Sequence, residues 1–236
     1  MDNKIIRDVK IALNNIHSDY FEMPVVSLNG ENLIIDNDDL KNYERRFMIE
    51  FASQYGKLID TDLDNIYNGT KKDFEIPKKY MWSEAPDLKV RETFQKLNEK
   101  DDSETMLNYI TTYPDFLIHK HQTDKTPNNQ KLIIEAKTGL SKSRIEFLKD
   151  IFHINIYADK YDFQNNVLLL IHLPKYKWTE YLEEYYKCRY FLCRKEKISN
   201  IYVIFKETYN SDIEVIKFDK LINGFYNKKS PTHTKT

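Results

Sequence analysis

Hydrophobic residues recur in several parts of the chain at the spacing of about 3.6 residues that is typical of an amphipathic helix. In one such segment Phe47, Phe51 and Tyr55 share a face, and Asp38-Asp39 precede it where an N-terminal cap is expected. The spacing as a whole predicts helices over residues 2–20, 40–59 and 87–98, from Ser141 or Ser143 to beyond Tyr157, and from Trp178 to about Leu192.

Between these helices the pattern changes to the short apolar runs that are typical of strands. Val167–Ile171 is apolar throughout, as expected for a strand that is covered on both faces. Residues 60–86, which contain Gly69, Pro77 and Pro86, are expected to be irregular apart from one short strand, and the last dozen polar residues to be frayed. Strands are predicted over residues 33–35, 109–118, 131–138, 167–171, 201–205 and 213–218, the last two as a hairpin.

This order of elements predicts an α/β fold with a mixed sheet at its centre and helices on both sides. The chain has 236 residues, and no stretch of it has the composition of a linker. We therefore expect a single elaborated domain over residues 1–236, with a helix and a hairpin added at about 176–220.

Composition excludes several classes of protein. Hydrophobic residues make up 41% and charged residues 31%, as in ordinary globular proteins. The 5 glycines form no phosphate-binding loop, and the net charge of -1 means that nucleic-acid binding needs a local basic patch. No apolar run reaches the roughly 18 residues of a membrane span, and the first residues have no signal-peptide pattern, so we expect a cytoplasmic protein with no membrane partner.

Charged residues directly behind the apolar run Leu132–Ile134 point to chemistry at the end of a strand. Glu135 and Lys137 project from the same face of that strand, because side chains alternate along it. If the preceding strand pairs antiparallel with this one, Asp115 lies beside Glu135. Two adjacent carboxylates repel each other unless a cation lies between them, and a hard divalent cation with oxygen ligands, Mg²⁺ or Mn²⁺, fits best. The carbonyl of Ala136 can add a further oxygen.

Pro114-Asp115, followed after about nineteen residues by Glu135-Ala136-Lys137 behind an apolar strand, resembles the motif of the PD-(D/E)XK nuclease superfamily. The resemblance covers about residues 40–173. It implies a restriction-endonuclease-like α-β-β-β-α-β core, Mg²⁺-dependent hydrolysis of phosphodiester bonds in DNA with Mn²⁺ as a substitute, and a role in restriction or phage defence. It also implies that Asp115 and Glu135 bind the metal and that Lys137 is the catalytic lysine.

Members of this superfamily often supply a further acidic ligand from the first helix of the core. Glu44 and Glu50 are the candidates, and Glu44 is preferred because it shares the stripe of Phe47 and Phe51. The other interpretation of Glu44 is an exposed first-turn acid favoured by the helix dipole. On the later helix, His153 stands where some members carry glutamine, and we interpret Tyr157 as a core residue.

Basic residues in two places are candidates for contact with the DNA backbone. Arg189, Arg194 and Lys195 stand among tyrosines in a run that also fits the solvated face of a helix, and Lys71 and Lys72 stand in the irregular region. A double-strand cut with one site per chain calls for two chains, so a homodimer is a further expectation.

Two other interpretations remain open. The three motif residues can be unrelated charges that protect the edge of a sheet. Alternatively, a nuclease-like fold can serve as a non-catalytic module that binds nucleic acid or protein. The sequence leaves open the form of DNA that is bound, the bases that are read, and whether cleavage starts at an end or within the strand.

Overall fold

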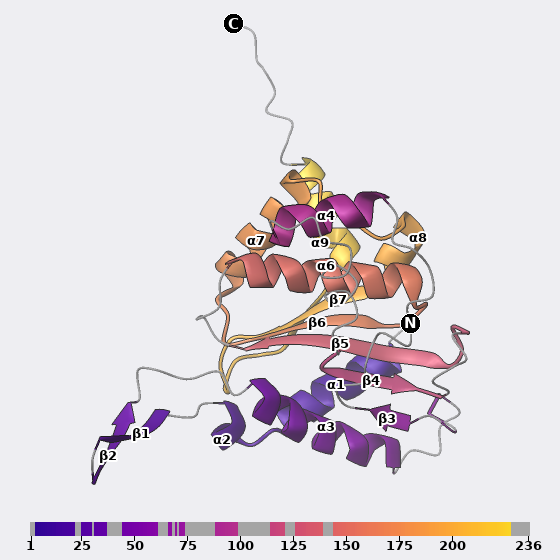
Figure 1. Ribbon diagram of the computed structural model, residues 1–236. Coiled ribbons are helices and arrows are strands. Elements are labelled where there is room, and N and C mark those ends of the chain that lie inside the picture. The colour runs from indigo at the N-terminus through magenta and orange to yellow at the C-terminus, as the bar shows by residue number, and fades with distance from the viewer. Residues whose placement is uncertain are drawn as a thin grey trace, which may run out of the picture.

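A six-stranded mixed sheet lies between two layers of helices (Figure 1). The structure is a computed structural model, which describes residues 3–21, 25–29, 31–36, 44–60, 66–67, 69, 71–73, 88–98, 114–120, 126–138 and 144–227. The strands, in their order across the sheet, are β3 (Lys71–Asp73), β4 (Phe116–His119), β5 (Gln130–Thr138), β6 (Asn166–Ile171), β7 (Ile201–Lys206) and β8 (Glu214–Lys217). The predicted α/β architecture with a mixed central sheet is confirmed.

The direction of the strands decides which of their ends meet. β5, β6 and β7 are parallel to one another, whereas β3, β4 and β5 pair antiparallel, as do β7 and β8. The carboxyl ends of the three parallel strands therefore meet at one edge of the sheet, where Thr138, Ile171 and Lys206 lie in register. Ligands of open α/β sheets commonly bind outside such an edge.

One face of the sheet is covered by α1 (Lys4–Asn14), α2 (Ser18–Phe21) and α3 (Glu44–Asp60). The expected stripe on α3 is buried: the rings of Phe51 and Tyr55 meet the ring of Phe116 on β4 with centroids 5.4 and 5.5 Å apart. The strand predicted at residues 33–35 is β2 (Asn32–Asp36), and it pairs with β1 (Val25–Asn29) in a separate two-stranded sheet.

The other face carries α4 (Leu88–Asn98), α6 (Arg144–Lys160), α7 (Lys175–Lys187), α8 (Lys195–Ile198) and α9 (Phe218–Asn227) (Figure 1). α6 lies between the sheet and other helices, so nearly all of its residues from Phe147 onward are buried, polar ones included. This helix connects β5 to β6 and packs against the end of β5.

Several predicted boundaries are wrong. The first helix ends at Asn14, and a separate short helix follows at Ser18. The helix expected to reach Leu192 ends at Lys187, after which Arg189 adopts a left-handed backbone conformation with φ of 52°. The hairpin at 201–205 and 213–218 is confirmed, but Phe218 begins α9 instead of ending a strand. Residues 109–113 of another predicted strand lie outside the described residues.

In the described ranges no helix has both the length and the apolar character required to cross a lipid bilayer.

Replacement of a core residue on α3 should be far more costly than replacement of its exposed neighbour. Phe51→Ala removes a fully buried ring that contacts the sheet and is expected to lower the free energy of unfolding by about 3–5 kcal/mol. Ile49 is 53% exposed, and Ile49→Ala should cost less than about 0.5 kcal/mol. Urea denaturation of both variants measures the difference, and equal losses would contradict this packing of α3.

Candidate active site

β5 extends beyond the point at which its pairing with β4 begins, and two carboxylates accept hydrogen bonds from its N–H groups there. Pairing between β4 and β5 begins with Phe116 opposite Ile134. Beyond that point Asp115 Oδ2 accepts a hydrogen bond from the Ala136 N–H at 2.6 Å, and Glu44 Oε2 accepts one from the Thr138 N–H at 3.3 Å. Buried N–H groups require acceptors, so the end of the β4 pairing draws acids from two elements to one place.

The carbonyl of Ala136 points toward the same edge. The N–H and C=O groups of one strand residue point to the same neighbouring strand, so this carbonyl is directed where β4 has ended. Asp115, Glu44 and the Ala136 carbonyl therefore bring oxygen atoms to a single stretch of sheet edge.

Glu135 and Lys137 extend toward α6, as the alternation of side chains predicts. Lys137 Nζ lies 2.8 Å from Asp150 Oδ2 and 4.0 Å from Glu44 Oε2. The Tyr157 hydroxyl donates a 2.6 Å hydrogen bond to Glu135 Oε1. Asp150 and Tyr157 are two helical turns apart on α6 and thus contact two residues, Lys137 and Glu135, that project from β5 toward this helix.

Negative charge exceeds positive charge in this cluster. The pKa of Lys137 is raised, because Asp150, Glu44 and Asp115 together outweigh the burial that would lower it. Burial raises the pKa of Asp150 to about 7; Lys137 lowers it, and the negative charges of Glu44 and Asp115 raise it further. One ammonium group therefore does not neutralise the surrounding carboxylates.

The structure places all of Glu44, Asp115, Glu135, Ala136 and Lys137 in this cluster. Of the two acids proposed on the first helix of the core, Glu44 is the one that reaches β5, whereas Glu50 accepts a hydrogen bond from Gln54 of its own helix.

Two residues of α6 in the cluster received no role from the sequence. Tyr157 is fully buried, as interpreted, yet its hydroxyl also contacts Glu135. Asp150 is an acid seven residues, or two helical turns, before Tyr157 on α6. This spacing was the signal in the sequence that it belongs to the same site.

The oxygen atoms of the cluster are of the type that binds a divalent cation. Carboxylate and carbonyl oxygens are the ligands that Mg²⁺ and Mn²⁺ prefer, and each carboxylate has more lone pairs than its hydrogen bond to the backbone uses. With the side chains as they lie, no three histidine, cysteine, aspartate or glutamate residues of the described part converge closely enough to hold an ion. The cation would therefore have to draw the carboxylates away from their present N–H and lysine partners.

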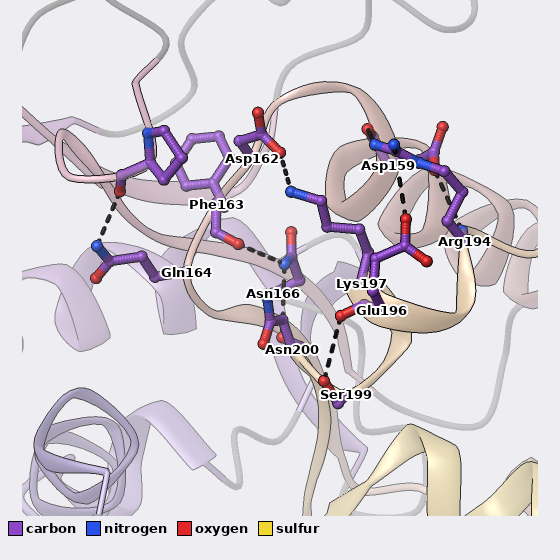
Figure 2. Close-up of polar contacts among 11 residues, drawn as sticks. Asp159, Asp162, Phe163, Gln164, Asn166, Arg194, Glu196, Lys197, Ser199 and Asn200 are labelled. Carbon is purple, nitrogen blue, oxygen red and sulfur yellow. Dashed lines mark hydrogen bonds and ion pairs between the residues drawn. The ribbon is translucent and has the colours of Figure 1, made fainter.

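Two of the basic residues proposed for DNA contact, Arg194 and Lys195, lie apart from the cluster. They stand next to the amino end of β7, whereas the cluster lies at the carboxyl end of the parallel strand β5. The Arg194 backbone N–H and Nε both donate to Asp159 Oδ1, at 3.2 and 3.0 Å, and so attach α8 to the end of α6 (Figure 2).

The expectation that the basic run at 187–197 forms the solvated face of one helix is wrong, because α7 ends at Lys187 and Arg189 lies in a turn after it. Lys71 and Lys72 pair with β4 at the edge of the sheet, and their side chains lie outside the described part. DNA contact by these residues stays a prediction.

Comparisons with protein-family models, with curated proteins and with solved structures find no match for this chain. Any functional assignment therefore depends on the geometry of the cluster.

Asp150 should make the stability of the protein depend on pH. Its pKa is raised from 3.8 to about 7 on folding, so between these pH values the folded protein holds a proton that the unfolded chain has released. This contribution to stability therefore decreases as pH rises from about 4 to about 7, by at most about 1.4 kcal/mol per pH unit.

The non-titrating variant Asp150→Asn tests this expectation. Urea denaturation at pH 5 and pH 8 measures the free energy of unfolding. From pH 5 to pH 8 this free energy should fall less in Asp150→Asn than in the wild type. Glu146→Gln, an exposed change on the same helix, should behave as the wild type does. If the free energy of unfolding changes equally from pH 5 to pH 8 in all three proteins, the raised pKa of Asp150 is refuted.

Proposed function

We propose that the protein is a metal-dependent deoxyribonuclease of the PD-(D/E)XK type, which hydrolyses phosphodiester bonds. The observation that carries the proposal is the gathering of Glu44, Asp115 and Asp150 around Lys137 at the end of β5, with Glu135 two residues earlier on the same face of that strand. The surplus of negative charge is costly in an isolated structural cluster, and it is reduced by a bound divalent cation.

The order of the elements supports the same proposal. α3, β3, β4, β5, α6 and β6 follow one another in the α-β-β-β-α-β order that the resemblance implies, with α4 inserted between β3 and β4. β4 and β5 are antiparallel and β5 and β6 are parallel, so Asp115 and Glu135 come from the antiparallel pair β4–β5.

Asp115, Glu135, Glu44 and the Ala136 carbonyl are the groups that would hold Mg²⁺ or Mn²⁺. When bound, the ion supplies positive charge beside the scissile phosphate and favours the ionisation of water. Hydrolysis requires no covalent intermediate with the protein.

The remaining residues position and charge the site. Lys137 stays protonated at neutral pH, so its ammonium can donate hydrogen bonds to the phosphate oxygens and stabilise the charge that develops there. Asp150 holds the Lys137 ammonium in position through their ion pair, and the Tyr157 hydroxyl fixes the orientation of Glu135 through a hydrogen bond.

DNA as the substrate, a second copy of the chain for a double-strand cut, and a role in restriction or phage defence belong to this proposal. They rest on the resemblance of the motif alone.

A non-catalytic binding module is the second candidate, and one observation favours it. Asp115 and Glu44 both accept hydrogen bonds from backbone N–H groups of β5, and Lys137 already forms an ion pair with Asp150. These contacts give the three residues a structural role without any chemistry.

A cleavage assay with purified protein separates the two candidates. The wild type should cut or nick DNA with Mg²⁺ or Mn²⁺ and not with EDTA. Glu135→Gln and Lys137→Met should each lower the rate at least about 100-fold, because each removes a group that acts on the transition state. Both changes keep the approximate size of the side chain, and thermal denaturation shows whether each variant folds.

The matched control is Glu146→Gln, which removes an exposed carboxylate from the same helix and should retain the wild-type rate. If the wild type is inactive on duplex, branched and single-stranded DNA, or if Glu135→Gln and Lys137→Met are as active as Glu146→Gln, the nuclease assignment is wrong.

A further inference from the structure

A second polar site lies beyond the acidic cluster, between α1 and the loop that joins β7 to β8. It is an open pocket with a volume of about 560 Å³, within the size range of small-molecule sites. Its walls come from the last turns of α1 and from residues 209–213 of the loop, and its inner end from Lys206, the last residue of β7. None of these residues belongs to the acidic cluster.

Lys206 is a buried cation with spare hydrogen-bonding capacity. Only 4% of its surface is exposed, and its Nζ donates a 2.8 Å hydrogen bond to the Ser211 carbonyl and lies 5.4 Å from the centre of the Phe21 ring. An ammonium group has three N–H donors, and within the described residues the Ser211 carbonyl is the acceptor that it reaches. Burial lowers the pKa of Lys206, with Asp212 as an opposing influence, so its charge is incompletely compensated.

The other polar groups of the pocket are mainly donors. Lys10 and Asn14 are one helical turn apart on α1 and line the pocket together, and the loop adds Tyr209 and Asn210 to the lining. Asp212 is the one acid of the lining, so two ammonium groups face one carboxylate. Lysine, asparagine and hydroxyl donors are the groups that commonly contact phosphate oxygens.

The position of Lys206 connects this pocket with the acidic cluster. Thr138, whose N–H is bonded to Glu44, lies in register with Ile171 on β6, which lies in register with Lys206 on β7. Two strand spacings separate Thr138 from Lys206, a distance of about 10 Å. Lys206 and the helices α1 and α2 are on the same face of the sheet as α3, which carries Glu44 (Figure 1).

We propose that this pocket binds a phosphate group, and that the group belongs to the nucleic-acid strand whose neighbouring phosphodiester lies at the acidic cluster. The span of about 10 Å between Thr138 and Lys206 is short enough for a segment of one nucleic-acid strand to reach both places, because phosphates repeat along the strand. Binding of phosphate by the pocket stands by itself, whereas the strand as its source rests on the proposed nuclease function.

The phosphate site is tested without metal and without cleavage. Inorganic phosphate is titrated by calorimetry into the wild type in EDTA, and into Lys10→Met, Lys206→Met and Asp212→Asn. The two lysine variants should bind phosphate about tenfold more weakly, because each loses a charge-assisted hydrogen bond. Asp212→Asn should bind it more tightly, because the opposing charge is gone.

Lys96→Met is the matched control, since Lys96 is an exposed lysine on α4 and should be without effect. Lys10 is exposed on α1, so Lys10→Met tests the pocket even if Lys206→Met fails to fold. Absence of phosphate binding to the wild type, or equal affinity in Lys10→Met and Lys96→Met, would overturn the site.

A second arm identifies the source of the phosphate. If it belongs to the substrate strand, Lys10→Met should raise the KM for cleavage of a single-stranded oligonucleotide about tenfold and leave kcat unchanged. Unchanged KM with weakened phosphate binding would instead assign the pocket to free phosphate or a mononucleotide and refute the strand. A wild type that binds phosphate but cleaves no DNA refutes the nuclease function and, with it, the strand as the source.

Discussion

Within the described residues, β5 extends beyond its pairing with β4, and the candidate site depends on the hydrogen bonding of this last part of the strand. β4 begins at Phe116, so the N–H groups of Ala136 and Thr138 need acceptors that no strand in the described part supplies. Asp115 and Glu44 supply them, and in doing so two carboxylates become fixed within a few ångströms of a strand that already carries Glu135 and Lys137. A requirement of backbone hydrogen bonding thus produces a concentration of negative charge.

This charge is held in place by the packing around it. α6 lies across β5 and presents Asp150 to Lys137 and the Tyr157 hydroxyl to Glu135, while the apolar residues of β5 and β6 keep the strands rigid. A site built on a buried strand and a buried helix is more precise than one built on loops. The cost is a carboxyl group, Asp150, whose burial raises its pKa to about 7.

The sequence predicted those features that depend on a short repeat of hydrophobic residues. The stripe of Phe47 and Phe51, the apolar run at 167–171 and the alternation at 131–138 predicted α3, β6 and β5 closely, and the last of these placed Glu135 and Lys137 on one face. The contact between Asp115 and β5 also followed from the expected antiparallel pairing.

Features that depend on tertiary contacts could not be predicted in the same way. The pairing of Lys137 with Asp150 requires the crossing of α6 over β5, which no local pattern specifies. The interpretation of the basic run at 187–197 as one helix failed because Arg189 turns the chain and Arg194 binds Asp159, an acid that lies 35 residues earlier. Lys206 ended an ordinary apolar strand in the sequence, and only its burial against Phe21 distinguishes it from other strand-end lysines.

A crystal structure of the protein grown with Mn²⁺ would show whether the carboxylates around Lys137 form a cation site. We expect anomalous scattering from an ion in contact with Asp115 and Glu135 beside the Ala136 carbonyl, with the side chain of Lys137 still paired with Asp150. Anomalous density elsewhere, or none at this edge of β5 with Asp115 and Glu44 still bonded to the N–H groups of Ala136 and Thr138, would contradict it.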